Sequence, residues 1–234
     1  MPEDPARELK ELARNLAGWL RYQRRLGRLG VPAELAPQPP EAAPIAGPSP
    51  TLKEVRAELG DCRRCKLAGG RTRLVFGEGF PRAELMFIGE GPGEEEDLQG
   101  LPFVGAAGQL LNSLLSRLGL KREEVYIANV VKCRPPGNRE PEADEMAACL
   151  PFLKKQIEAI RPRVIVTLGR VATQALLATQ APLTRIRGRW QRFGKIPVMP
   201  TFHPSYLLRF PKERHKTWED MQQVMELLAG HDET

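Results

Sequence analysis

Four short apolar runs, separated by segments with helical patterning, constrain the fold of this 234-residue chain more than any other feature. The apolar runs lie at 84–89, 125–131, 163–169 and 196–202. The segments with helical patterning lie at 51–59, 105–118, 141–160, 170–179 and 214–229. Runs of this length match buried strands, and strands that alternate with helices favour a parallel sheet. The pattern therefore predicts an α/β fold whose central, mostly parallel, four-stranded sheet is flanked by helices.

A proline-rich stretch divides the chain. Seven of the 22 prolines fall within residues 31–50, together with many alanines, which is typical of an extended linker. Before it, residues 1–30 are charged and carry leucines at roughly helical spacing, so we expect an N-terminal helical extension. After it, residues 51–234 hold all the predicted strands and form the main domain.

The composition narrows the class of protein. Hydrophobic residues make up 41% and charged residues 27% of the chain, as in water-soluble globular proteins. No run of about 18 apolar residues is present, and the first residues lack the apolar core of a secretory signal. We therefore expect a cytoplasmic location. The net charge of +6 permits a polyanionic partner.

The excess positive charge is concentrated late in the chain. Residues 185–216 contain nine basic residues and one acid, with aromatic residues interleaved. A basic surface with aromatic or apolar wedges suits a nucleic-acid groove, although a solvated basic face would have the same composition.

The four cysteines have an unequal spacing. Cys62 and Cys65 form a C-x2-C pair, whereas Cys133 and Cys149 are separated by fifteen residues. Four thiolates can hold zinc or an iron–sulfur cluster, and the unequal spacing favours a cluster that joins distant segments. Four unrelated buried cysteines are the alternative. Disulfides are disfavoured because nothing indicates secretion.

Ligands of parallel α/β sheets bind beyond the carboxyl ends of the strands, which points to residues 89–97, 129–139 and 202–209. The first of these, GEGPGEEED, lacks the Gly-Lys-Ser/Thr of a Walker A loop. It has Glu94 where a dinucleotide fingerprint needs glycine, and its acids would repel phosphate. Gly91 and Gly93 instead permit a sharp turn and the close approach of a flat ligand.

Two polar residues stand out at the other strand ends. Asn129 interrupts an apolar strand, so its amide needs hydrogen bonds, either to the backbone or to the amide-like edge of a ligand. His203 follows the last strand and is a candidate for charge stabilisation or proton transfer.

Together these features resemble the family 4 uracil-DNA glycosylases, the iron–sulfur branch of that superfamily. The resemblance covers about residues 51–230. It is carried by the four cysteines and by four motifs, namely GEGPGEEED (89–97), PFVG (102–105), IANVVKCRPPGNR (127–139) and FHPSYLLR (202–209).

The resemblance implies a role for each matching residue. Phe103 would stack on a uracil extruded from DNA, Asn129 would pair with its imide edge, and His203 would stabilise the charge that develops on O2. The pocket would be lined further by Gly89, Glu90 and Gly91. Cys62, Cys65, Cys133 and Cys149 would bind a structural [4Fe–4S] cluster. DNA would be contacted by Ser205, Tyr206, Leu207, Arg209 and Arg187, with Tyr206, Leu207 or Leu208 as the wedge.

The group that handles the attacking water is the open point of this mechanism. In family 1 an Asp in the equivalent turn assists, but here that place is taken by Gly91. Either the phosphates of the substrate and His203 do most of the work, or an acid, Glu96 or Asp97, substitutes. We prefer Glu96, so the predicted catalytic set is His203, Glu90, Gly91 and Glu96. The related covalent-trapping enzymes carry a His that the CRPPGNREP segment lacks, so we expect ordinary turnover.

Two other functions stay open at this point. One is a non-catalytic iron–sulfur module that binds DNA during replication or repair. The other is a metal-dependent hydrolase that uses Glu94–Asp97 as ligands. Residues 1–30 are expected to serve as a docking segment for a repair or replication protein, or as a dispensable extension. A monomer is the expected oligomeric state.

Overall fold

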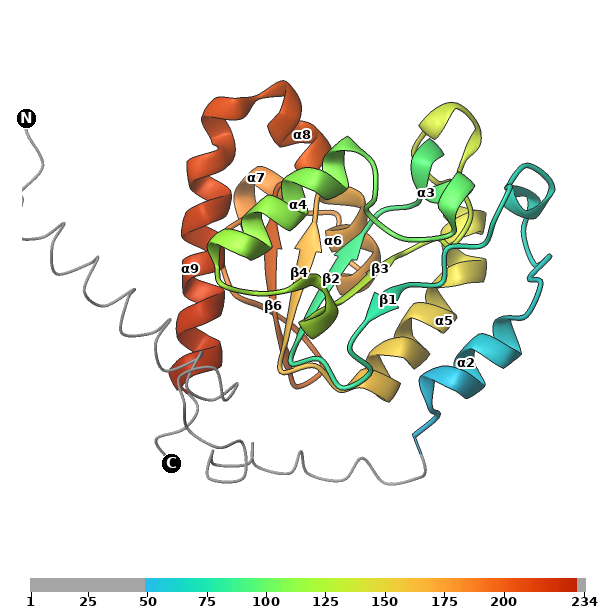
Figure 1. Cartoon of the computed structure of the whole chain (residues 1–234), viewed down its shortest axis with the longest axis horizontal. Coiled ribbons are helices and arrows are strands. Elements are labelled where there is room, and N and C mark those ends of the chain that lie inside the picture. The colour runs from blue at the N-terminus through green and yellow to red at the C-terminus, as the bar shows by residue number, and fades with distance from the viewer. Residues whose placement is uncertain (1–48, 231–234) are drawn as a thin grey trace, which may run out of the picture. The chain divides into compact units, whose positions relative to one another are not determined.

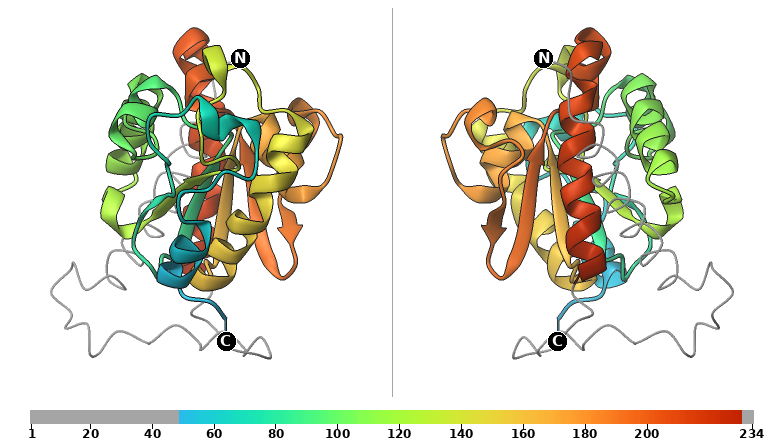
Figure 2. Two further views of the ribbon diagram at one scale, coloured as in Figure 1. Left: turned by 90° about the vertical axis from the view of Figure 1, so that its right-hand side faces the viewer. Right: turned by 90° about the vertical axis from the view of Figure 1, so that its left-hand side faces the viewer.

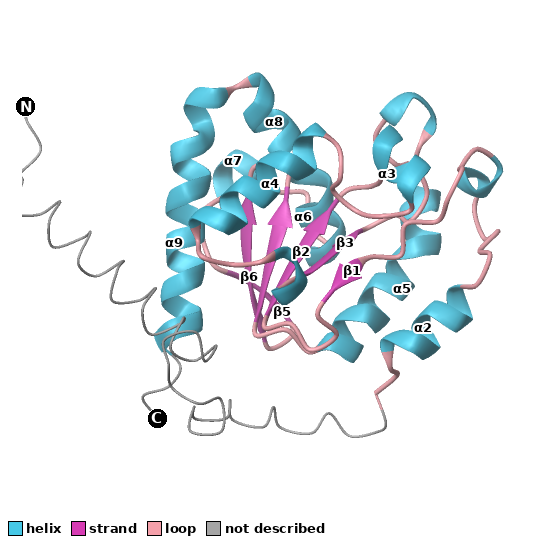
Figure 3. Ribbon diagram, in the orientation of Figure 1, coloured by secondary structure: helices cyan, strands magenta, loops and turns pink. Residues whose placement is uncertain are grey.

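The computed structural model describes residues 49–230. Within these residues the strands form one six-stranded sheet in the order β1-β3-β2-β4-β6-β5 (Figures 1 and 3). The strands are β1 (Glu78–Gly79), β2 (Leu85–Gly89), β3 (Tyr126–Asn129), β4 (Val164–Leu168), β5 (Gln191–Phe193) and β6 (Ile196–Thr201). The four inner strands are mutually parallel, and β1 and β5 pair antiparallel at the two edges. The predicted fold class and its four parallel strands are therefore confirmed, and the edge strands are added to them.

The helices lie between the strands as the sequence predicts. The α-helices are α2 (Leu52–Leu59), α3 (Glu94–Gln99), α4 (Ala106–Arg117), α5 (Ala143–Ile160), α6 (Arg170–Leu177), α7 (Leu183–Ile186), α8 (Pro204–Arg209) and α9 (Arg214–Gly230). Short 3₁₀ turns are η2 (Lys66–Gly69), η3 (Arg122–Glu124), η4 (Pro136–Asn138) and η5 (Pro211–Glu213). Of the α-helices, α3, α7 and α8 were not expected from the sequence. They are four to six residues long, too short for a helical period to show.

The described residues fall into two units. Residues up to Asp220 form the unit that carries the sheet, and the part of α9 from Met221 onward belongs to the second unit. The predicted helical extension and linker, residues 1–30 and 31–50, lie outside the described residues except for the last two positions of the linker. The boundaries of the main domain stay a prediction. None of the described helices is long and apolar enough to cross a membrane.

Local sequence explains where the first helix begins. Thr51 accepts a hydrogen bond from the backbone N–H of Glu54 at 3.2 Å. The Glu54 carboxylate accepts in return from the Thr51 backbone N–H at 2.7 Å. This capping box satisfies two N–H groups that the first helical turn leaves without partners, so α2 starts at the residue that the sequence predicts.

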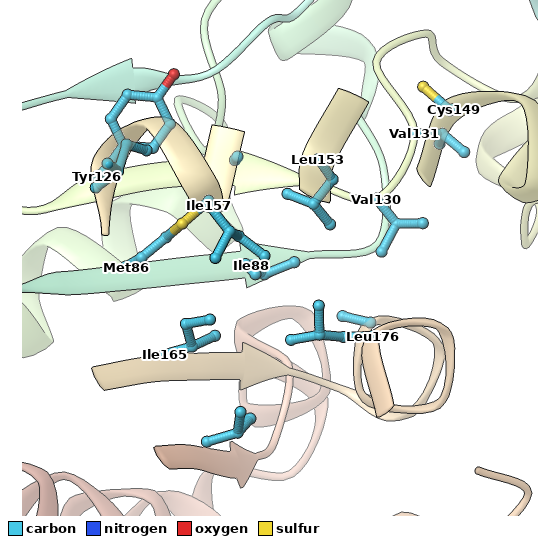
Figure 4. Packing of buried hydrophobic residues seen from close by; sticks show 14 of the residues in the cluster. Met86, Ile88, Tyr126, Val130, Val131, Cys149, Leu153, Ile157, Ile165 and Leu176 are labelled. Carbon is cyan, nitrogen blue, oxygen red and sulfur yellow. The ribbon is translucent and has the colours of Figure 1, made fainter. Parts of the chain in front are cut away.

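The core lies on both sides of the sheet because all residues of β2, β3 and β4 are buried. In Figure 2, α4 lies on one side of the strands and α5 and α6 lie on the other. Alternate strand residues such as Met86, Ile88 and Ile165 pack against Leu153 and Ile157 of α5 (Figure 4). The same cluster reaches Leu176 of α6 and, at one end, Cys149. A sheet covered on both faces needs continuous apolar strands, which is the pattern of the sequence.

Candidate active site

A cavity of about 490 Å³ lies beyond the carboxyl ends of the four parallel strands. Its walls come from the segments after β2, β3 and β6, which are the three places that the strand-end argument predicts. Gly169 and Arg170, which follow β4, complete the wall and were missed. The same rule applied to the third apolar run would have found them.

The ring of Phe103 forms one side of this cavity. The residue is 5% exposed and its φ is +52°, a left-handed conformation that non-glycine residues seldom adopt. Its ring lies 5.6 Å from the ring of His203, measured between centroids. A flat ligand can therefore stack on Phe103 with one edge toward His203.

Asn129 ends β3, paired in the parallel register with Gly89 at the end of β2. The Asn129 side chain is fully buried, and its Oδ1 has no hydrogen-bond partner among the described residues. A Cβ on Gly89 would lie 2.4 Å from that Oδ1 and 2.6 Å from the Phe103 ring. The missing side chain at residue 89 thus keeps free the space that the amide and the aromatic ring share.

His203 is the N-cap of α8, and its Nδ1 accepts a hydrogen bond from the Ser205 backbone N–H at 3.2 Å. An accepting Nδ1 leaves the ring proton of the neutral form on Nε2. Burial lowers the pKa of His203 to about 4, an effect that the nearby carboxylate of Glu96 partly opposes. His203 is therefore a neutral Nε2–H donor at physiological pH.

The Glu96 carboxylate accepts hydrogen bonds from three backbone N–H groups. One oxygen accepts from the N–H groups of Val104 at 2.8 Å and Gly105 at 2.9 Å, and the other accepts from Gly93 at 3.1 Å. Three donors occupy both oxygens, which ties the glycine turn to the loop that carries Phe103. This geometry does not favour the water-activating role that we expected of Glu96, which stays an untested prediction.

Asp97 also binds backbone. Both of its oxygens accept from the Thr72 N–H at 2.9 Å, and its side chain is buried. Within the described residues no group of three or more His, Cys, Asp or Glu is arranged to hold a single metal ion. The acidic run 94–97 forms the first part of α3, and two of its four carboxylates, those of Glu96 and Asp97, accept hydrogen bonds from backbone N–H groups. Nothing here supports a hydrolase that uses these acids as metal ligands.

Glu90 differs from the other acids of the cavity. It lines the wall next to Gly91, and its pKa is set by burial and by neighbouring charges, with no hydrogen bond among the causes. Burial, with a smaller contribution from the charge of Glu140, raises the pKa of Glu90 to about 7. Arg170 opposes this rise, but it is paired with Glu140 at 2.6 Å. Glu90 is thus a cavity acid whose charge changes near neutral pH.

The DNA-contact predictions divide into two groups. Ser205, Tyr206 and Arg209 of α8 line the mouth of the cavity. Leu207, in contrast, is 4% exposed, so the geometry does not favour it as a DNA contact, which stays an untested prediction, and Leu208, at 39% exposure, is the accessible leucine. Consecutive residues of a helix point about 100° apart, which separates the two side chains.

Arg187 is also engaged within the protein. Its guanidinium donates to Asp220 Oδ1 at 2.6 Å and to the Lys216 carbonyl at 2.9 Å. It lies over the Phe202 ring as well. These contacts hold the side chain against its own chain, so the geometry does not favour Arg187 as a DNA contact.

The four cysteines come together although they are far apart in sequence. Cys62, Cys65, Cys133 and Cys149 line one small cavity, and none of them is in a disulfide. Arg64 donates to the Cys62 sulfur at 3.3 Å, and Arg71 donates to the Cys133 sulfur at 3.2 Å. Lys132 lies beside the same cavity.

Cationic donors around the sulfurs suit thiolates that carry negative charge. A four-iron cluster takes one thiolate on each iron, so its ligands need not converge on one point. The cysteines therefore fit such a cluster better than a single ion.

Two basic residues that support the cavity were not singled out from the sequence. Lys132 is buried, and its Nζ donates to the Asn129 carbonyl at 2.8 Å and to Gln156 at 2.6 Å. Arg122 donates to the carbonyls of Pro102 and Phe103. Lys132 lies within the predicted strand-end segment 129–139, where it was overlooked, whereas Arg122 follows no strand end and so gives no such signal in the sequence.

Fold and site together define an α/β protein with a cavity at the strand ends that is lined by an aromatic ring, an unsatisfied amide acceptor and a neutral histidine donor. Residues 76–228 match the model of the uracil DNA glycosylase superfamily.

Curated relatives narrow this class. The chain is 47% identical over 186 residues to a type-4 uracil-DNA glycosylase of Sulfurisphaera tokodaii, covering 76% of this chain and 84% of that protein. It is 49% identical to the type-4 enzyme of Saccharolobus solfataricus, covering 76% and 87%. For the type-4 enzyme of Thermotoga maritima the identity is 53%, covering 68% and 84%. The chain belongs to the type-4 uracil-DNA glycosylases.

Proposed function

We propose that the protein removes uracil from DNA by hydrolysing the N-glycosidic bond, which leaves free uracil and an abasic site. The observation that carries this proposal is the buried Oδ1 of Asn129, which lacks a donor inside a cavity walled by Phe103 and His203. Uracil has an N3–H that can donate to this oxygen and an O4 that can accept from the Asn129 amide. Cytosine presents the reverse pattern, and a site of buried polar groups rejects such an analogue by roughly 10⁴–10⁵.

His203 supplies the main electrostatic contribution in this proposal. Breaking the glycosidic bond leaves an electron pair on the uracil ring, so the leaving group is an anion. A neutral Nε2–H directed at O2 stabilises this anion by donating a hydrogen bond, and the proton stays on the imidazole. One such preorganised donor contributes about 2.7–4 kcal/mol to a transition state. The Ser205 N–H bond to Nδ1 fixes the ring in the required tautomer.

The water attacks the sugar carbon that uracil leaves. We assign its orientation to Glu90, because Glu96 is engaged with three backbone N–H groups and Gly91 has no side chain. A general base is most effective when its pKa lies near the working pH, and the pKa of Glu90 is about 7. A proton taken from the water would move to this carboxylate.

DNA approaches the mouth of the cavity at α8 in this proposal. Leu208 is the exposed apolar side chain that can fill the space vacated by the extruded base, and Arg209 lies beside it. Tyr206 stacks between Phe202 and Phe210, with centroid distances of 4.8 and 4.7 Å, which stiffens the helix that carries the wedge. Extrusion is easiest at mismatched or single-stranded uracil. Access to genomic DNA is consistent with the cytoplasmic location expected from the sequence.

We also propose a [4Fe–4S] cluster at Cys62, Cys65, Cys133 and Cys149, with a structural role. The supporting observations are the shared cavity and the two arginine donors at the sulfurs. When bound, the cluster would join covalently the loop before η2, the segment after β3 and the first half of α5.

A cleavage assay tests the proposed function. Anaerobically purified protein is incubated with EDTA and labelled oligonucleotides that contain one uracil, and alkali then reveals abasic sites. We expect breakage only at uracil, with a loss of about 100-fold or more for His203→Ala. Protein that shows cluster absorbance near ~400 nm but breaks no strand would favour the non-catalytic iron–sulfur module instead.

A further inference from the structure

Arg122 contacts the carbonyls of the two peptide groups that flank Phe103. Its Nη1 donates to the Phe103 carbonyl at 3.1 Å, and its Nη2 donates to the Pro102 carbonyl. The residue lies in η3, nineteen positions after Phe103 in the sequence. It does not line the cavity, so it is not a catalytic residue.

The guanidinium itself is held by other side chains. Nη1 also donates to Asn112 Oδ1 at 3.1 Å, and Nε and Nη2 both donate to Glu78 Oε2 at 3.2 Å. Together with the two carbonyl contacts, these bonds use all five N–H groups of the arginine, and Glu78 Oε2 accepts two of them. A lysine has a single nitrogen and cannot occupy this arrangement.

The segment that Arg122 contacts is under conformational strain. Phe103 has a φ of +52°, and its carbonyl lies so close to α4 that a Cβ on Gly108 would be 1.9 Å from it. A non-glycine residue in this conformation costs about 1–3 kcal/mol and persists only where its surroundings over-determine it. The two carbonyl contacts of Arg122 are part of that determination.

We infer that Arg122 is the positioning residue that fixes the Phe103 ring as the stacking platform for the extruded base. The inference rests on the proposed function. Stacking acts on bound uracil and on the transition state alike, so weakening it lowers affinity more than the maximal rate. The loss of a hydrogen-bond donor to the uracil anion would instead lower the maximal rate more than the affinity, because that interaction is stronger in the transition state than in the bound substrate.

The test compares Arg122→Gln and Glu78→Gln with Arg117→Gln, a control on α4 whose guanidinium lies over the Trp218 ring, away from the platform. For each variant we measure inhibition by free uracil, KM and kcat on uracil-containing DNA, and the melting temperature. For Arg122→Gln we expect inhibition by uracil to weaken and KM to rise about tenfold, with kcat within about threefold of the unsubstituted protein. Glu78→Gln should show the same pattern to a smaller extent, and Arg117→Gln should leave all three kinetic quantities unchanged.

Two results would overturn the inference. One is uracil inhibition within about twofold of the unsubstituted protein in folded Arg122→Gln. The other is a fall in kcat with KM unchanged. If Arg122→Gln does not fold, Glu78→Gln decides, because it keeps the guanidinium and removes only its charged partner. If the unsubstituted protein releases no uracil at all, the proposed function fails; if it releases uracil and the variants behave as the control does, this inference alone fails.

Discussion

Replacement of Glu90 by Gln tests two points: the raised pKa of the Glu90 carboxyl in the cavity, and the proposal that this carboxyl orients the attacking water. Burial raises the pKa of Glu90 from 4.5 to about 7, so the folded state holds the proton more tightly than the unfolded state. Below pH 4.5 both states are protonated. As the pH rises from 4.5 to about 7 the unfolded state ionises first, and the protein loses stability that a neutral Gln would not lose.

The size of this loss follows from the two pKa values. A pKa shift from 4.5 to about 7, at about 1.36 kcal/mol per pKa unit, sets an upper limit of about 3.4 kcal/mol on the loss of unfolding free energy. Solvent screening at a half-buried carboxyl reduces this loss to about 1–2 kcal/mol. For a protein of this size that corresponds to roughly 2–8 °C in melting temperature. We expect Glu90→Gln and the unsubstituted protein to melt alike at pH 4, with the variant melting higher at pH 8.

Kinetics supply the second half of the test. Single-turnover excision should rise through an inflection near pH 7, and Glu90→Gln should lose the inflection and at least about 100-fold in rate above pH 7. Glu140→Gln is the matched control, because Glu140 contributes to the raised pKa of Glu90 and pairs with Arg170. It should keep the inflection and move it to lower pH. An inflection near pH 7 that survives in Glu90→Gln would refute the reasoning.

Three further predictions follow from the geometry. Gly89→Ala should abolish excision in a single-turnover assay, because the new Cβ would lie 2.4 Å from Asn129 Oδ1, whereas Gly70→Ala, with nothing within 4 Å, should be neutral; equal rates for the two would contradict this. Glu96→Gln should lower stability by about 1–3 kcal/mol in calorimetry yet keep the pH 7 inflection, and loss of the inflection would restore Glu96 as the water-orienting acid. Leu208→Ala should reduce excision from double-stranded DNA more than from single-stranded DNA, and an unchanged ratio would remove Leu208 as the wedge.

The sequence predicted the four inner strands and most helices because their signals are local. Runs such as 85–89 are continuously apolar and end at glycine, and Thr51 with Glu54 marks a helix start three residues apart. The edge strands carry no such signal, since β1 is two residues long and β5 contains a glutamine and an arginine. A short edge strand is defined by its neighbour in the sheet, which the sequence of the strand itself does not reveal.

The site divides in a similar way. Asn129 and His203 were predictable because a polar residue in or after an apolar strand is anomalous where it stands. Glu96 and Leu207 were assigned by residue type, and their surroundings do not favour the assigned roles: three backbone N–H groups hold the first, and the core buries the second. Arg122 is one arginine among many until its five hydrogen bonds, to four acceptor atoms from distant segments, are seen together.

These supporting residues explain how the strained loop 102–105 can hold its conformation in the absence of DNA. In the segment 102–105, Arg122 binds the carbonyls of the first two residues, and Glu96 binds the N–H groups of the last two. One cation and one anion thus hold one backbone group from each of four successive residues around the left-handed Phe103. Glu96 also binds Gly93, so the platform and the glycine turn form one connected unit. Because this unit is preorganised by the protein alone, differences in excision rate among DNA contexts should arise from the cost of extruding the base and not from assembly of the pocket.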